Sequence, residues 1–208
     1  MPFTQQNIHL NSVSIHLLHY LDFDIPTFLS ELTEEEKHYF FSFKHEKRKK
    51  EFLATRFLRN ELFGKETILY NKIGAPYMVG QANISISHAS KVSGIAVSND
   101  FQVGFDIESI SGKASRVAHK FLSDQELAEF DINNEAEMSA AWSAKETLYK
   151  LAGRKEIIFK TDLHIKKLDE DNWWGRISNP GEVLETNLKI IRQKDIIITV
   201  NTANCESK

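Results

Sequence analysis

The sequence predicts an α+β fold with mainly antiparallel sheets, and three observations support this prediction. Segments with strand and helix patterns are mixed along the chain without the regular strand–helix–strand alternation of a parallel sheet. A close hairpin is indicated at Asn99-Asp100, a turn signal between two strand-like runs. No glycine-rich loop of the dinucleotide-binding or Walker type is present. A doubly wound parallel sheet is therefore not expected.

The composition is that of an ordinary globular chain. Of the 208 residues, 41% are hydrophobic and 26% are charged, which excludes a disordered or low-complexity chain. The single cysteine, Cys205, excludes an intrachain disulfide and any multi-cysteine zinc module. The first residues carry no signal-peptide pattern, and no apolar stretch reaches the roughly 18 residues of a membrane span. We expect a soluble protein of a reducing compartment, without a membrane partner.

Two helices are predicted to begin with the same motif. Thr33 with Glu36, and Ser123 with Glu126, have the spacing of a capping box, in which each side chain bonds the backbone of the other residue. Both motifs begin with a leucine, at positions 32 and 122. The helix starts are therefore expected near these residues.

The long helices are predicted to end at glycines. The helix that follows Thr33 is expected to break between 42 and 47 and to resume up to Gly64. A second strong helix is expected from 136 to Gly153. Strands are predicted at 83–88, 94–98, 101–108, 160–167, 173–177, 188–191 and 195–202.

The two halves of the chain carry similar landmarks in the same order. We interpret them as a duplication that produced two subdomains, 1–98 and 99–208, related by pseudo-twofold symmetry, each a mainly antiparallel sheet packed with a long helix. The alternative is a chance alignment of common patterns. The paired landmarks are LDFDI (21–25) with VGFDI (103–107), LTEEE (32–36) with LSDQE (122–126), and LFG (62–64) with LAG (151–153).

A basic run lies in the first half. Residues 37–50 contain six Lys or Arg and one Glu, although the whole chain has a net charge of −3. Such a run in an acidic chain indicates an anionic ligand, or else a solvated helix face. Its interleaved aromatic residues also suit stacking on nucleic acid. More simply, these aromatic residues form helix core.

The strand at 103–108 places two carboxylates on one face. Because strand side chains alternate, Asp106 and Glu108 share a face with Gly104, opposite the apolar residues. Two carboxylates on a half-buried face repel each other unless a cation lies between them, and oxygen ligands suit Mg²⁺. Gly104 would leave room for a ligand on that face. The alternative is an exposed polar strand face.

The helix at 136–153 offers a third carboxylate. Trp142, Glu146 and Lys150 follow one another at i, i+4 and i+8, so they form a stripe that is not apolar. Glu146 is a candidate metal ligand and Lys150 a candidate phosphate ligand, although an ordinary surface Glu–Lys pair has the same spacing. His88, at the end of a predicted strand, is either a core histidine or an anion ligand.

In combination, these residues resemble the 4′-phosphopantetheinyl transferases. The family pattern G-[VIF]-D-x-E is present as GFDIE at 104–108, and [FW]-[SCT]-x-K-E-[AS]-x-x-K as WSAKETLYK at 142–150. The ISH of 86–88 matches the strand that precedes them in the family. The length and the two similar halves resemble the single-chain, pseudo-dimeric Sfp type, which implies a cytoplasmic monomer.

Three positions depart from the family pattern. Phe105 and Thr147 are small departures. The family's G-K-P loop is present as Gly74-Ala75-Pro76, so a lysine that helps relatives to hold coenzyme A is missing. The resemblance implies that nearby basic residues replace it, with Arg48 and Arg56 as the candidates.

The resemblance implies an activity and a set of ligands. The 4′-phosphopantetheine arm of coenzyme A would pass to a serine of an acyl or peptidyl carrier protein in fatty-acid, polyketide or nonribosomal-peptide synthesis, releasing 3′,5′-ADP. Mg²⁺, or Mn²⁺, would bind Asp106, Glu108 and Glu146. Asp106, Glu146 and Lys150 would be catalytic, with Glu146 as the base or only a metal ligand. Arg48, Arg56, His88, Lys145 and Lys150 would bind coenzyme A.

The resemblance also implies a docking site for the carrier, on the segment 109–122, which carries Lys113, Arg116, His119 and Lys120.

Two other interpretations of the sequence remain open. A degenerate relative that binds coenzyme A without transfer is one alternative. A nucleic-acid-binding module built on 37–50 is another, although no nucleic-acid motif is present and we expect no such partner.

Overall fold

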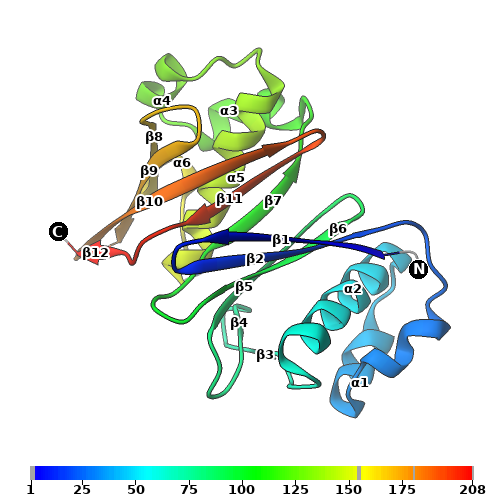
Figure 1. The fold of residues 1–208 in the computed structure, drawn as a ribbon. Helices are drawn as coiled ribbons and strands as arrows, with labels where there is room; N and C mark the ends of the chain where they lie inside the picture. Colours follow the sequence, from blue (N-terminus) through cyan, green and yellow to red (C-terminus); the bar gives the residue numbers. More distant parts are fainter. Residues whose placement is uncertain (1–2, 154–155, 180, 208) are drawn as a thin grey trace.

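Two antiparallel sheets face each other in the computed structural model, and a long helix covers the outer side of each (Figure 1). The structure describes residues 3–153, 156–179 and 181–207. The fold is therefore α+β with antiparallel sheets, as the sequence predicts. Within these three ranges, no helix combines the length and the apolar character that crossing a membrane requires.

The first sheet is built from the first half of the chain. Its order is β1-β2-β6-β5, with every neighbouring pair antiparallel. A small two-stranded sheet, β3 with β4, lies before β5 in the chain. The strands are β1 (Phe3–Leu10), β2 (Val13–Tyr20), β3 (Leu69–Tyr70), β4 (Pro76–Tyr77), β5 (Asn83–Ala89) and β6 (Val92–Ser98).

The second sheet is built from the second half. Its order is β7-β11-β10-β9-β8, and β12 pairs with β10. The long β10–β11 hairpin crosses in front of α5 in Figure 1. The strands are β7 (Phe105–Ser109), β8 (Leu163–Lys167), β9 (Asn172–Asn179), β10 (Glu182–Gln193), β11 (Ile196–Asn201) and β12 (Glu206–Ser207).

The predicted helices begin and end near the expected residues, and the described residues also form three helices that the sequence did not predict, at Pro26–Glu31, Lys113–Phe121 and Phe159–Asp162. Both capping boxes form, at Thr33–Glu36 and Ser123–Glu126, and the long helices end at Gly64 and Gly153 with φ of 68° and 63°. Only glycine adopts such angles without strain. The helices are η1 (Pro26–Glu31), α1 (Glu34–Ser42), α2 (Glu46–Phe63), α3 (Lys113–Phe121), α4 (Asp124–Glu129), α5 (Glu135–Ala152) and α6 (Phe159–Asp162).

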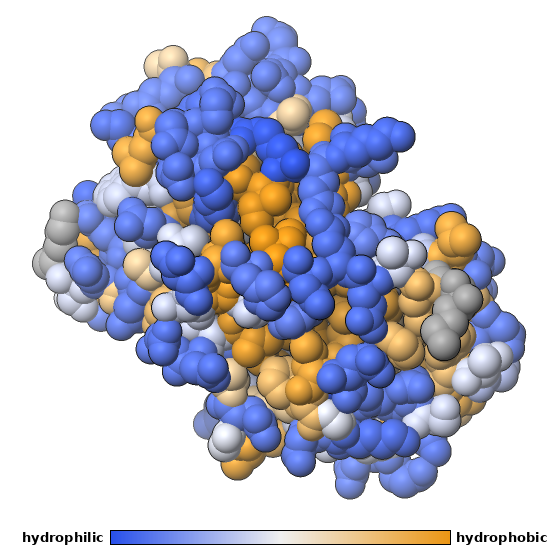
Figure 2. All heavy atoms as spheres, viewed as in Figure 1, coloured by the Kyte–Doolittle hydropathy of each residue, from blue (hydrophilic) through white to orange (hydrophobic). Residues whose placement is uncertain are grey.

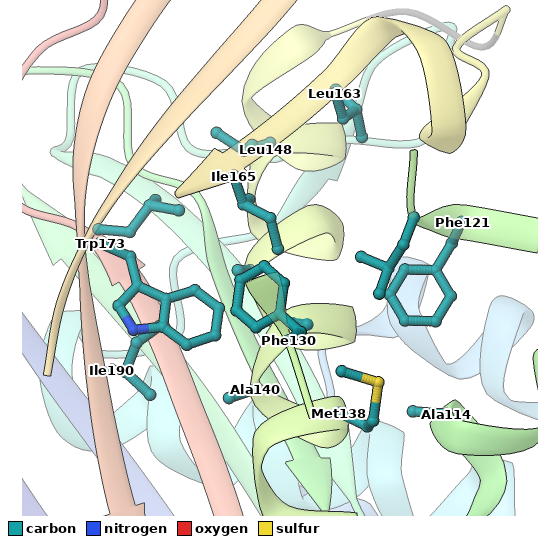
Figure 3. Packing of buried hydrophobic residues seen from close by; sticks show 14 of the residues in the cluster. Ala114, Phe121, Phe130, Met138, Ala140, Leu148, Leu163, Ile165, Trp173 and Ile190 are labelled. Carbon is teal, nitrogen blue, oxygen red and sulfur yellow. The ribbon is translucent and has the colours of Figure 1, made fainter. Parts of the chain in front are cut away.

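Three apolar clusters fill the spaces between the layers. The first lies between α5 and the second sheet, where Trp173 and Phe130 pack beside Met138 and Leu148 (Figure 3). The second joins the two sheets, and apolar side chains gather in the hollow between the halves in Figure 2. The third packs α2 against the first sheet. Each sheet therefore buries both of its faces.

The two halves share a connectivity. In the first, β2 leads through η1, α1 and α2 to the β5–β6 hairpin, and β6 pairs with β2. In the second, β7 leads through α3, α4 and α5 to the β10–β11 hairpin, and β11 pairs with β7. Every strand of the first sheet lies within 3–98, and every strand of the second after 104. The twofold relation itself stays a prediction.

One landmark pair does not align in the structure. Residues 103–107 lead into β7, whereas 21–24 form no strand and precede η1. The strand equivalent to β7 in connectivity is β2, which lies just before this segment. The similar sequences LDFDI and VGFDI therefore correspond to different structures, a loop in the first half and mainly a strand in the second. The other two landmark pairs form the same structures in both halves, a capping box and a helix end at glycine.

Candidate active site

The candidate site lies where the edge strands of the two sheets meet. Strand β5 ends the first sheet and β7 ends the second, and the two strands lie in contact. Lys150, on α5, donates hydrogen bonds to the backbone oxygen of Ile86 on β5, at 3.3 Å, and to that of Phe105 on β7, at 2.6 Å. One side chain therefore joins both halves at this edge.

Asp106 is held from both sides. Its Oδ1 accepts hydrogen bonds from Lys150 Nζ, at 3.0 Å, and from Ser87 Oγ, at 2.8 Å. Its Oδ2 is buried and, among the residues described, has no hydrogen-bond partner. A buried carboxylate oxygen without a partner is costly, since it has lost its hydration. This oxygen is therefore a position where a cation would be stabilised.

Two further carboxylates lie close enough to repel Asp106. Burial, and then the charge of Asp106, raise the pKa of Glu108 to about 7, although Trp142 Nε1 donates to its Oε1 at 3.1 Å. Burial, and again Asp106, raise the pKa of Glu146 to about 7, with Lys150 opposing the shift. The strand alternation and the helix stripe thus bring the three predicted carboxylates together.

The donor set fits a hard divalent cation. Lys150 pairs with Asp106 but is, among the described residues, the one cation bonded to the three carboxylates, whose raised pKa values and unpartnered buried oxygen indicate negative charge that is only partly compensated; oxygen ligands suit Mg²⁺. Among the side chains that the structure describes, no group of three His, Cys, Asp or Glu is drawn together as closely as a metal ion would hold it. Coordination by all three residues therefore stays a proposal.

A cavity lined by cationic side chains shares Lys150 with the carboxylates, although none of the three carboxylates lines it. It has a volume of about 270 Å³ and is lined by residues of both halves. Arg48 comes from α2, His88 from β5 and Lys150 from α5, and Tyr70 closes one side. Gly74, Ala75 and Pro76 line it as well, so the loop that lacks the family's lysine does face this cavity.

The imidazole of His88 is neutral near neutral pH. Burial, followed by the positive charges of Arg48 and Lys150, lowers the pKa of His88 to about 3. Its Nδ1 shares a hydrogen bond of 3.1 Å with Ser93 Oγ. An anion in the cavity would offset the neighbouring charges, so the site is suited to phosphate.

Arg56 lies behind the cavity and not in it. Its side chain is 2% exposed, Nε donates to Glu36 Oε1 at 2.7 Å, and the guanidinium lies 3.8 Å from the ring centroid of Phe52. Both terminal nitrogens donate to the hydroxyl of Tyr70, at 3.3 Å each. Arg56 therefore reaches the cavity only through Tyr70, and the predicted direct contact with coenzyme A does not fit its placement.

Lys145 is not brought to the site. Its side chain is 0% exposed, and Nζ donates to Glu126 and to the backbone oxygens of Phe121, Phe159 and Leu163. These contacts join α4, α5 and α6 inside the second half. The prediction that Lys145 holds a phosphate of coenzyme A is therefore not supported by its surroundings.

Gly104 has a packing role. A Cβ at this position would lie 2.6 Å from the backbone oxygen of Thr147 and 2.6 Å from Cγ of Leu151. The interpretation that Gly104 leaves room for a ligand is wrong, because α5 fills that space. The close approach of α5 to β7 is what brings Glu146 beside Asp106.

Most of the basic run is solvated helix surface. Lys50 pairs with Asp22 and Glu46, and Arg48 pairs with Glu51 at 3.3 Å while its side chain stays 52% exposed. The simpler interpretation of the aromatic residues is confirmed only in part: Phe40 is buried in the core against α2, whereas Tyr39 and Phe41 are 63% and 65% exposed. Arg48 is the member of the run that lines the cavity beside His88.

The comparison with protein families agrees with the second half of this site. Residues 102–200 match the 4′-phosphopantetheinyl transferase superfamily. The match contains the three carboxylates and Lys150, and it indicates a transferase of this kind, acting in general by phosphopantetheinyl transfer. Proteins of this superfamily use coenzyme A, typically with a divalent metal, and act on carrier proteins. No curated protein matches the chain.

The superfamily match leaves the first half of the site uncovered. Arg48, Tyr70, Ser87 and His88 all lie before residue 102. Ser87 and Tyr70 were given no role from the sequence. The only sequence signal for Ser87 was its place in the ISH motif, and the solvent-exposed hairpin around Tyr70 carried no signal at all.

Proposed function

We propose that this protein moves the 4′-phosphopantetheine arm of coenzyme A onto a serine hydroxyl of an acyl or peptidyl carrier protein. The carrier oxygen forms a bond to the β-phosphorus of the pyrophosphate, the bond from that phosphorus to the bridging oxygen breaks, and 3′,5′-ADP leaves. The observation that supports this most is that Lys150 lines the cationic cavity and also binds Asp106, whose charge raises the pKa of the other two carboxylates.

The cavity residues suit the phosphates of coenzyme A. Arg48 presents a partly exposed guanidinium and His88 an imidazole that gains a proton when an anion arrives. Lys150, already fixed by Asp106 and two backbone oxygens, presents its charge to the leaving phosphate. Such fixed charges stabilise the developing charge without rearrangement.

Asp106, Glu108 and Glu146 would hold the metal ion. A bound divalent cation supplies charge neutralisation and orientation of the pyrophosphate. We also propose Glu146 as the base for the carrier serine when it is not bound to the metal, since its pKa of about 7 in the metal-free site suits a base near neutral pH. In the alternative, it acts only as a metal ligand while a water takes the proton.

The carrier would dock along α3. Lys113, Arg116, His119 and Lys120 are exposed on this helix, and its buried side packs on α5. A second cavity, of about 280 Å³, lies between α3 and the carboxylates and is lined by Glu108, Lys113 and Trp142 among others. A basic helix beside the reacting groups suits the acidic surface that carrier proteins present.

The decisive experiment incubates the protein with Mg²⁺, coenzyme A and an apo-carrier, and weighs the carrier by mass spectrometry. A mass gain equal to the phosphopantetheine arm supports the proposal. The Glu146→Gln variant should lose transfer and retain coenzyme A binding, whereas Glu137→Gln, on the same helix but paired with Lys167, should transfer normally. Coenzyme A binding without transfer to any of several carriers would favour the degenerate binder.

A further inference from the structure

Ser87 belongs to one half of the molecule but holds a side chain of the other half. It lies on β5, is 6% exposed, and its Oγ donates to Asp106 Oδ1 on β7 at 2.8 Å. The same oxygen accepts a hydrogen bond from the backbone nitrogen of Ile107 at 3.1 Å. The hydroxyl therefore has one donor and one acceptor partner, both on β7.

These two contacts fix how the Asp106 carboxylate is turned. Ser87 and Lys150 both bind Oδ1, from opposite halves of the chain, and the described residues offer no partner to Oδ2. If the carboxylate rotated away from this orientation, Oδ1 would lose its hydrogen bonds to Ser87 and Lys150. The arrangement therefore keeps Oδ1 engaged and leaves Oδ2, which is buried, without a hydrogen-bond partner among the described residues, so that a cation bound there would meet an uncompensated acceptor.

We infer that Ser87 is a positioning residue of the proposed reaction: its hydroxyl, supplied by the first half, turns Asp106 so that Oδ2 is presented to a divalent cation. The inference rests on the proposed function. The side-chain hydrogen bonds of Ser87 are with Asp106 and with the backbone of Ile107, so its effect on the metal would pass through Asp106. Lys150 binds the same oxygen, so the Ser87 hydroxyl adds a second hydrogen bond that holds Oδ1 from the other half of the chain.

If the role of Ser87 were only structural, a different result would be expected. Such a residue would contribute to the junction of β5 and β7, and its loss would lower thermal stability without changing metal affinity. A positioning residue changes metal affinity in the folded protein. Partners that orient metal-ligating carboxylates typically change affinity by about 10–100-fold when they are removed.

The test measures Mn²⁺ binding by electron paramagnetic resonance in the presence of coenzyme A, with wild type, Ser87→Ala and Ser87→Thr. The Ser87→Ala variant should bind Mn²⁺ about 10–100-fold more weakly, and Ser87→Thr, which keeps the hydroxyl, should recover most of this loss. Ser143→Ala is the matched control, because Ser143 is also a buried serine but its Oγ has no hydrogen-bond partner among the described residues. Circular dichroism confirms that each variant is folded.

Each outcome separates this inference from the proposed function. If wild type transfers the arm and folded Ser87→Ala binds Mn²⁺ as tightly as wild type, the positioning role is overturned while the transferase stands. If wild type neither binds Mn²⁺ nor modifies any carrier, the proposed function fails and the inference fails with it. If Ser87→Ala does not fold, Ser87→Cys keeps the side-chain bulk and should show the same direction of change in Mn²⁺ affinity.

Discussion

Lys145 Nζ lies 2.7 Å from Oε2 of Glu126, and both side chains are buried. Burial lowers the pKa of Lys145, and Glu126 opposes that shift by stabilising the charged amine. The first half contains a similar arrangement, because Arg59 Nη1 lies 2.9 Å from Glu36 Oε1. In each half, a capping-box glutamate that begins a short helix is paired with a cation of the long helix after it.

Replacing Lys145 with Met should destabilise the fold and spare the ligand site. The change leaves Glu126 buried and unpaired, which typically lowers the free energy of unfolding by about 3–5 kcal/mol. Denaturant unfolding gives this number, and titration calorimetry of the folded variant should give wild-type affinity for coenzyme A. Lys160→Met removes an exposed pair with Asp124 and should change stability by about 0–1 kcal/mol. If Lys145→Met were as stable as wild type and bound coenzyme A more weakly, the result would support the original prediction that Lys145 binds a phosphate.

Binding of coenzyme A should take up a proton at His88. The pKa of His88 is about 3 in the free protein, owing to burial and to the cations Arg48 and Lys150, so the imidazole is neutral near pH 6. A phosphate in the cavity raises this pKa towards its ordinary value of about 6.5. Calorimetry at pH 6 without metal, in buffers of different ionisation enthalpy, measures the uptake. A His88→Asn variant should take up fewer protons, and equal uptake would contradict the assignment.

The metal-free protein should lose stability as the pH rises from about 4.5 to about 7. Glu108 and Glu146 have pKa values raised to about 7, so in this window the folded state binds more protons than the unfolded state, and the free energy of unfolding falls with pH. Well above pH 7 both carboxylates are charged in either state and this contribution is constant. His88 acts in the opposite direction below about pH 6.5, because the folded state keeps it neutral.

The informative quantity is therefore the difference between wild type and the double variant Glu108→Gln/Glu146→Gln. Thermal midpoints measured by calorimetry from pH 4.5 to pH 8 should show that the double variant gains relative to wild type as the pH rises. Addition of Mg²⁺ should raise the wild-type midpoint at pH 8 and leave the variant unchanged. If the thermal midpoints of the two proteins changed with pH in parallel, Glu108 and Glu146 would not have raised pKa values and the repulsion between the carboxylates would be ruled out.

A methyl group at position 104 should push α5 away from β7. In Gly104→Ala the new Cβ would meet the backbone oxygen of Thr147 at 2.6 Å, and backbone does not yield as a flexible side chain does. We expect a loss of about 1–3 kcal/mol in the free energy of unfolding, as for overpacked cores, together with reduced transfer. Gly112→Ala is the control for stability, since the nearest atoms to its Cβ would be the ends of the flexible side chains of Glu135 and Arg116. A Gly104→Ala protein with wild-type stability and transfer would contradict the close-packing role.

Local patterns predicted much of the fold because their physical causes are local. Capping boxes and glycine helix ends depend on residues a few positions apart, and both are present as expected. The strand expected at 101–108 forms only from Phe105 to Ser109, and Asp106 is buried in it together with Phe105 and Ile107. The N-terminal hairpin of β1 and β2 was not predicted, because its exposed strand is mainly polar and gives no clear alternation. The strand expected at 160–167 begins instead with the short helix α6.

The site was predicted unevenly for a similar reason. The grouping of Asp106, Glu108 and Glu146 follows from one strand face and one helix face, so spacing sufficed. The placement of Lys145 and Arg56 depends on distant partners, Glu126 and Glu36, which no local pattern identifies. A basic residue beside a motif looks the same whether it faces solvent, a ligand or a buried carboxylate.

The junction of β5 and β7 has a consequence for each half considered alone. The last strand of a sheet exposes unpaired backbone groups, which invite association with other chains. Here Lys150 binds a free backbone oxygen on each edge and Ser87 binds a free nitrogen, so the same contacts that build the site also close both edges. If the two halves were separated between β5 and β7, each half would expose an open sheet edge. The separation would therefore abolish the site and also increase the tendency to aggregate.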